Sequence, residues 1–166
     1  MARRDDNAID LGLHLPFQIA QLHSALSAQA KVIISRYGDL NLAQWRIVRV
    51  VALDIANTST AVRTAAGIDK SQFSKMLTLL EDKGYVILHP WAEDKRQNVI
   101  ELTEMARKAH DRLGPILDAR QQHLVATLTE EEQAVVRKAI RAIAAASSKT
   151  DFDIPASAPS TYSVNI

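Results

Sequence analysis

Apolar residues recur every three or four positions over most of this chain, which is the spacing of an amphipathic helix. The pattern predicts helices over residues 16–37, 41–53, 58–66, 69–84, 104–128 and 129–146. Two β-prone runs, residues 85–89 and 98–102, lie on either side of a polar, charged loop and predict a β-hairpin. The chain is therefore predicted to be mainly helical, with one small hairpin.

The helix over residues 69–84 has the clearest ends. Asp69 is a good N-cap, because its carboxylate accepts the free N–H groups of the first turn, and Gly84 favours the left-handed conformation that ends a helix. Its buried stripe is Phe73, Met76, Leu77 and Leu80, at i, i+3, i+4 and i+7. The remaining face carries short polar side chains and one lysine: Ser71, Gln72, Ser74, Lys75 and Thr78. Such a face suits base edges and phosphates in a DNA major groove, and a solvated helix surface is the plainer alternative.

The elements around this helix complete a known arrangement. The preceding helix ends at Gly67, and only Ile68 separates that glycine from the cap Asp69, so two helices meet across a tight turn. Two such helices form a helix-turn-helix motif, and a hairpin after the second helix makes it a winged helix. The predicted fold is mainly α, a winged helix-turn-helix with a small β-hairpin wing.

The outer helices also have recognisable ends. Pro16 is a helix-starting residue, Asn41 with Gln44 resembles a capping box, and Thr129 opens a true one, Thr-Glu-Glu-Glu. The helix after Asn41 is apolar nearly all round, which predicts that it lies buried at the centre of the fold, with Leu53 among its apolar residues. The first and last helices carry more apolar surface than a winged helix of about 60 residues covers. Pro115 is expected to kink the long helix in between.

Four segments resemble the MarR family of transcriptional regulators: Leu42-Ala-Gln-Trp-Arg-Ile-Val, Leu80-Glu-Asp-Lys-Gly-Tyr-Val, Asp94-Lys-Arg96 and Leu102-Thr-Glu. The resemblance spans residues 16–146. It implies a homodimer held by long N- and C-terminal helices, which binds a palindromic operator in double-stranded DNA. It also implies that the protein is a repressor, which a small ligand releases from this DNA. The expected divisions are an arm and dimerisation helix (1–38), a DNA-binding domain (39–102), dimerisation helices (103–147) and a tail (148–166). Phe152, Ile154 and Tyr162 of the tail are candidates for docking on a partner.

The resemblance assigns roles to residues of the motif and the wing. Ser71, Gln72 and Lys75 are expected to contact bases or phosphates, with Ser74 and Thr78 beside them. In the wing, Arg96 is expected to enter the minor groove, Asp94 to hold its guanidinium, and Lys95 to contact phosphate; a charged hairpin tip without function is the alternative. Arg63 stands where the family usually has a small alanine, which leaves open whether it packs or contacts phosphate.

Family members often bind small anionic aromatic ligands between the DNA-binding lobe and the dimer helices. The residues here that suit such a cleft are His14, His23, Trp45, Arg46 and Arg49. Each also has a plainer interpretation: the tryptophan as a core residue, the arginines as partners of carboxylates, and the histidines as ordinary polar groups.

Composition adds limits rather than a function. The formal net charge is +1, and residues 63–96 hold six Lys and Arg against five Asp and Glu, so DNA binding depends on where the charges lie. The absence of cysteine excludes disulfides and thiolate metal sites. No phosphate loop, nucleophile elbow or close pair of histidines is present, so we expect no catalytic or metal site and no cofactor. No apolar run suits a membrane span or a secretion signal, which favours the cytoplasm. The alternative function is a winged-helix dimer that acts as a protein–protein interaction module without specific DNA binding.

Overall fold

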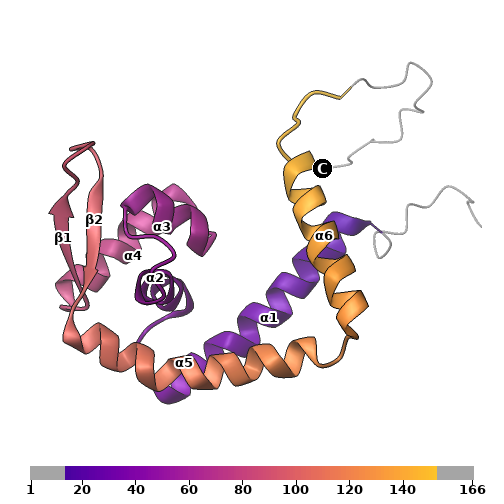
Figure 1. Ribbon diagram of the computed structural model, residues 1–166, viewed down its shortest axis with the longest axis horizontal. Coiled ribbons are helices and arrows are strands. Elements are labelled where there is room, and N and C mark those ends of the chain that lie inside the picture. Colours follow the sequence, from indigo (N-terminus) through magenta and orange to yellow (C-terminus); the bar gives the residue numbers. More distant parts are fainter. Residues whose placement is uncertain (1–13, 153–166) are drawn as a thin grey trace, which may run out of the picture. The chain divides into compact units, whose positions relative to one another are not determined.

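The computed structural model describes residues 14–152, and over that range it contains six helices and one two-stranded antiparallel sheet (Figure 1). In chain order these are α1 (Leu15–Tyr37), α2 (Leu42–Ala52), α3 (Ser59–Ala66), α4 (Lys70–Asp82), β1 (Val86–Pro90), β2 (Asn98–Leu102), α5 (Glu104–Val125) and α6 (Glu130–Ala146). The predicted fold class is confirmed, and each predicted element is present with its ends shifted by at most three residues. The chain divides after Gln121 into two compact units.

Helix α2 lies at the centre of the first unit, in contact with α1, α3, α4 and β2. Its start is fixed by a complete capping box, in which the Asn41 side chain accepts from the backbone N–H of Gln44 and the Gln44 side chain accepts from that of Asn41. Ile47 and Val48 are fully buried. Leu53 differs from the prediction, because the helix ends at Ala52 and leaves this leucine 47% exposed.

Helices α3 and α4 form the helix-turn-helix. Gly67 ends α3 with φ of 64°, a left-handed conformation that glycine adopts without strain, and the Asp69 side chain then caps α4 by accepting from the backbone N–H of Gln72. The predicted stripe of α4 is buried: Phe73, Met76, Leu77 and Leu80. The polar face of α4 therefore points away from the core.

The hairpin is anchored to the start of α3. Strands β1 and β2 pair in a register that aligns Val86 with Leu102 and Pro90 with Asn98. Ile100 donates its backbone N–H to the carbonyl of Asn57 at 2.8 Å. Asn98 donates its own N–H to the Ser59 hydroxyl at 3.2 Å. These bonds hold β2, from its middle to its loop end, against the start of the helix-turn-helix.

Helix α5 follows the wing directly and stays helical through Pro115, while the expected kink remains a prediction. In the second unit, Thr129 and Glu132 form the predicted capping box at the start of α6. No residue of α6 is buried within the single chain, although the helix is amphipathic. Phe152 is 70% exposed, and Ile154 and Tyr162 lie outside the described residues. None of the helices in residues 14–152 is long and apolar enough to cross a membrane.

Candidate nucleic-acid interface and adjoining cavities

The outward face of α4 is exposed along its whole length. Ser71, Ser74, Lys75 and Thr78 are all solvent-accessible, as predicted for a surface that meets another molecule. The Ser74 hydroxyl donates to the carbonyl of Lys70 at 3.1 Å, and the Thr78 hydroxyl donates to that of Ser74 at 3.2 Å. Because both hydroxyl hydrogens are used within the helix, these two oxygens are presented outward as acceptors, which suits the amino groups of cytosine or adenine.

The wing carries a preorganised arginine. One carboxylate oxygen of Asp94 accepts from the backbone N–H of Arg96 at 3.0 Å and from its Nε at 3.1 Å, and the other accepts from the Gln97 amide at 3.2 Å. The bond from the Arg96 backbone, and then those from the Arg96 and Gln97 side chains, lower the pKa of Asp94. The Arg96 side chain is 91% exposed. The predicted Asp94–Arg96 contact is therefore present, and Lys95 beside it is also exposed.

A concave surface, here called the wing hollow, lies where α3, α4 and the wing meet. Its volume is about 420 Å³, and it is lined by Ser59, Thr60, Arg63, Lys70, Phe73, Ser74, Leu77, Arg96, Gln97 and Asn98. Three of these side chains are cationic and none is acidic. Lys70 was not among the residues singled out from the sequence, because its partners in the hollow come from other elements.

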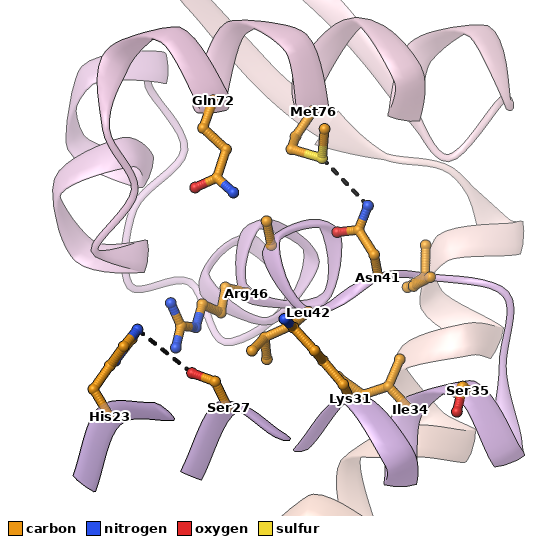
Figure 2. A pocket seen from close by; sticks show the side chains of 12 residues that line it. His23, Ser27, Lys31, Ile34, Ser35, Asn41, Leu42, Arg46, Gln72 and Met76 are labelled. Atoms are coloured by element: carbon orange, nitrogen blue, oxygen red, sulfur yellow. Dashed lines mark hydrogen bonds between the residues drawn. The ribbon is translucent and has the colours of Figure 1, made fainter. Parts of the chain in front are cut away.

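A second concavity, the α1–α4 cavity, separates the polar edge of α1 from the start of α4. It has a volume of about 530 Å³ and is lined by His23, Ser27, Lys31, Ile34, Ser35, Leu40, Asn41, Leu42, Ala43, Arg46, Gln72 and Met76. Figure 2 shows Gln72 and Met76 pointing into it from α4, opposite the side chains of α1. The Asn41 amide donates to the Met76 sulfur at 3.3 Å, and Ser27 lies 3.5 Å from the His23 ring nitrogen. Lys31 and Arg46 supply positive charge without any carboxylate in the lining.

A smaller hollow of about 330 Å³ continues from this cavity toward α5 and shares His23, Ser27, Leu42 and Arg46 with it. Arg49 lies in its wall with the guanidinium already engaged: Nη2 is 2.6 Å from the Asp118 carboxylate and Nη1 is 2.9 Å from Nε2 of His110. The ring of His110 in turn stacks on Trp45, with centroids 5.7 Å apart. Trp45 is 6% exposed and belongs to the core.

The structure thus separates the five ligand candidates. His23 and Arg46 line both concavities, Trp45 and Arg49 line only the smaller one, and His14 lines neither. Lys31 and Ser27 were not predicted from the sequence, although His23, Ser27 and Lys31 are spaced i, i+4 and i+8 and therefore share one face of α1. Gln72 was predicted only as a DNA contact, whereas its side chain lines the α1–α4 cavity.

The chain is similar to known proteins in sequence and in fold. No family model matches the chain. The HTH-type transcriptional regulator FarR of Neisseria gonorrhoeae is 24% identical over 126 residues, which cover 76% of this chain and 86% of FarR.

Solved structures match over most of the chain. A MarR/EmrR family transcriptional regulator from Acinetobacter sp. ADP1 superposes with a TM-score of 0.76 at 22% identity, over 86% of this chain and 100% of that one. The PcaV regulator of Streptomyces coelicolor, in complex with its natural ligand, gives 0.71 at 23% identity, over 89% and 99%. The S. aureus MepR–DNA complex gives 0.69 at 20% identity, over 81% and 97%. These likenesses show a shared fold.

Proposed function

Since the chain has the fold of the MarR family of winged-helix transcriptional regulators, we propose that it is a dimeric, sequence-specific DNA-binding regulator controlled by a small anionic ligand. The observation that carries the proposal is the exposed polar face of α4 next to the wing, where Asp94 holds Arg96 in an outward position. FarR, a transcriptional regulator, and the DNA complex of MepR support the same assignment. The proposal includes no catalytic step and no cofactor, and it places the protein in the cytoplasm with the DNA it regulates.

The proposed docking puts α4 in the major groove and the wing against the minor groove. Ser71 and Lys75 face bases or phosphates, and the Ser74 and Thr78 oxygens accept from base amino groups. Arg96 enters the minor groove, where negative potential is concentrated, and Lys95 contacts a phosphate. Held by Asp94, the Arg96 side chain has less conformational freedom to lose on binding.

The dimer is proposed from apolar surface that a single chain leaves uncovered. Helix α1 exposes Leu15, Phe17, Ile19, Leu22 and Val32, and helix α6 exposes Val135, Val136 and Ile140. Monomeric proteins rarely leave such apolar stripes in contact with water, so we assign both helices to the interface with a second copy. Two recognition helices then meet successive major grooves about 34 Å apart, which requires a palindromic operator.

The ligand is proposed to bind in the α1–α4 cavity. Lys31 and Arg46 favour a carboxylate or another small anion, while Leu42 and Met76 contribute apolar wall for a ring. PcaV, whose structure holds its natural ligand, supports a ligand-responsive regulator of this fold. Because α1 belongs to the proposed dimer interface and α4 to the DNA interface, a ligand that prefers one spacing of these helices shifts DNA affinity. We propose that the protein is a repressor and that the ligand releases it from DNA.

The test is a fluorescence-anisotropy titration against DNA flanking the protein's own gene, repeated over a salt series. The wild type should bind tightly and saturably, with affinity that falls as salt rises, and both Arg96→Ala and Lys75→Ala should abolish specific binding. Lys108→Ala is the control, because Lys108 is exposed on α5 and its ion pair within residues 14–152 is with Glu104 of the same helix. Weak binding that neither substitution changes would reject the proposal in favour of a protein–protein interaction module.

A further inference from the structure

The wing hollow holds more positive charge than its surroundings neutralise. Arg63 is half-buried on α3, Lys70 opens α4, and Arg96 reaches the hollow from the wing. Among residues 14–152, Arg96 forms an ion pair with Asp94, whereas Arg63 and Lys70 form none. A half-buried cation without a carboxylate is poorly compensated in the free protein, so the arrangement favours binding of an anion.

The hollow also offers neutral hydrogen-bond donors over an apolar floor. The Ser59 oxygen accepts from the backbone N–H of Asn98 at 3.2 Å, which leaves the Ser59 hydroxyl hydrogen free to point into the hollow. Phe73 and Leu77, 4% and 7% exposed, form part of the lining. Apolar walls exclude water and strengthen the attraction between a cation and an anion. Cations, a hydroxyl and an apolar floor together match a phosphate group.

The proposed docking fixes which phosphate this is. A sugar–phosphate strand separates the major groove from the adjacent minor groove in B-form DNA. If α4 occupies the major groove and Arg96 the minor groove, that strand must cross between α4 and the wing. The wing hollow lies between these two elements. The separating strand therefore passes over Arg63 and Lys70.

We infer that the wing hollow binds one backbone phosphate of the operator, held by the Arg63 guanidinium, the Lys70 ammonium and the Ser59 hydroxyl. Arg63 is then a DNA-contacting residue on the first helix of the motif, not a packing residue. The inference rests on the proposed function and deepens it. Because every DNA sequence carries this phosphate, the contact adds affinity and fixes position without reading bases.

The first test compares wild type, Arg63→Gln and Arg63→Lys by anisotropy on the operator and on a random duplex. Arg63→Gln should weaken binding to both by a similar factor, roughly 10-fold or more, because a phosphate contact is lost at both half-sites. The slope of log K against log salt should become shallower by about 1.8 for a dimer. Arg63→Lys, which keeps the charge, should retain most of the slope, and Lys108→Gln serves as the surface control.

The second test removes the charge from the DNA. A series of operators, each with one neutral methylphosphonate linkage at a different position, should identify one linkage on the strand between the two grooves. Neutralising that linkage should lower the affinity of the wild type and leave the affinity of Arg63→Gln unchanged. Additive losses at every position, or an unchanged salt slope in Arg63→Gln, would overturn the inference while leaving DNA binding by the wild type intact. Absence of salt-sensitive binding by the wild type would overturn the proposed function itself.

Discussion

The Tyr85 hydroxyl donates a hydrogen bond to the carboxylate of Asp39, and this bond joins the α1–α2 connection to the start of the wing. The bond lowers the pKa of Asp39 below its usual 3.8. Burial, and then the bond to Asp39, raise the pKa of Tyr85 from 10.0 to about 12. The fold thus favours ionised Asp39 and neutral Tyr85, so both groups link stability to pH.

Tyr85→Phe keeps the buried ring and removes only the hydroxyl. We expect the free energy of unfolding to fall by about 1 kcal/mol near neutral pH, which is less than the roughly 1.5–3 kcal/mol typical of a charged acceptor, because Asp39 is exposed. The Asp39 contribution is present above pH 3.8 and lost as pH falls through its lowered folded pKa. The Tyr85 contribution is present below pH 10.0 and lost as pH rises toward 12.

Urea denaturation at constant protein concentration checks this pH dependence. The difference between wild type and Tyr85→Phe should be largest between these limits and shrink at either end. Tyr37→Phe is the matched control, since Tyr37 is 43% exposed, and it should change stability little. A difference that stays constant as pH falls through the lowered pKa of Asp39 would mean that the negative charge of Asp39 does not strengthen the bond.

Lys31→Met tests the charge of the α1–α4 cavity. Methionine keeps most of the apolar stem and removes the ammonium, so the affinity for benzoate-type carboxylates should fall roughly 10-fold, the effect of losing one charge-assisted hydrogen bond. DNA affinity without ligand should stay within about twofold, because Lys31 lies on α1, outside the proposed DNA-contacting face. Calorimetry with benzoate and hydroxybenzoates, with Lys108→Met as control, measures this. Equal carboxylate affinity in the two variants would contradict an anion site at Lys31.

Gln72 and Ser71 are neighbours on α4 that face different surroundings. Gln72 lines the α1–α4 cavity, whereas Ser71 is exposed and lines none of the concavities described above. We expect Gln72→Ala to weaken carboxylate binding severalfold and Ser71→Ala to leave it unchanged, while Ser71→Ala lowers operator affinity. Parallel titrations with ligand and with DNA separate these effects. If both variants weaken only DNA binding, Gln72 contacts bases as the sequence alone suggested, and its orientation into the cavity is incidental.

Local rules were enough to predict the elements of the fold. The capping boxes at Asn41 and Thr129 and the glycine at position 67 involve neighbours within four residues, so their spacing is visible in the sequence. The buried stripe of α4 follows from the spacing of apolar residues every three or four positions. The end of α5 was placed three residues late, because Leu128 donates to the carbonyl of Val125 in a turn that apolar spacing cannot distinguish from helix.

The concavities depend on contacts that spacing does not encode. The wing hollow brings together Ser59 and Asn98, which are 39 positions apart, and the charge of Arg63 gains meaning only beside Lys70 and Arg96. Arg49 was a candidate both for a ligand and for a carboxylate partner, and only its contacts with Asp118 and His110 on α5 favour the second. A residue type suggests a chemistry, whereas its availability depends on which distant partner the fold places beside it.

Ile140→Glu tests the assignment of α6 to a dimer interface. Ile140 is 61% exposed in the single chain, and Val136 of the same apolar side is 41% exposed. Burying an isoleucine is worth about 1.5–3 kcal/mol, and a two-fold axis makes each substitution count twice, so the dimer should weaken by at least about 100-fold. Lys138→Glu introduces the same residue on the polar face of α6 and should leave the dimer intact. Sedimentation velocity over a dilution series should show a wild-type and Lys138→Glu dimer and an Ile140→Glu monomer. Operator affinity should also fall in Ile140→Glu, because a monomer engages one half-site at a time. A dimeric Ile140→Glu protein would remove α6 from the interface and leave the exposed face of α1 to form it.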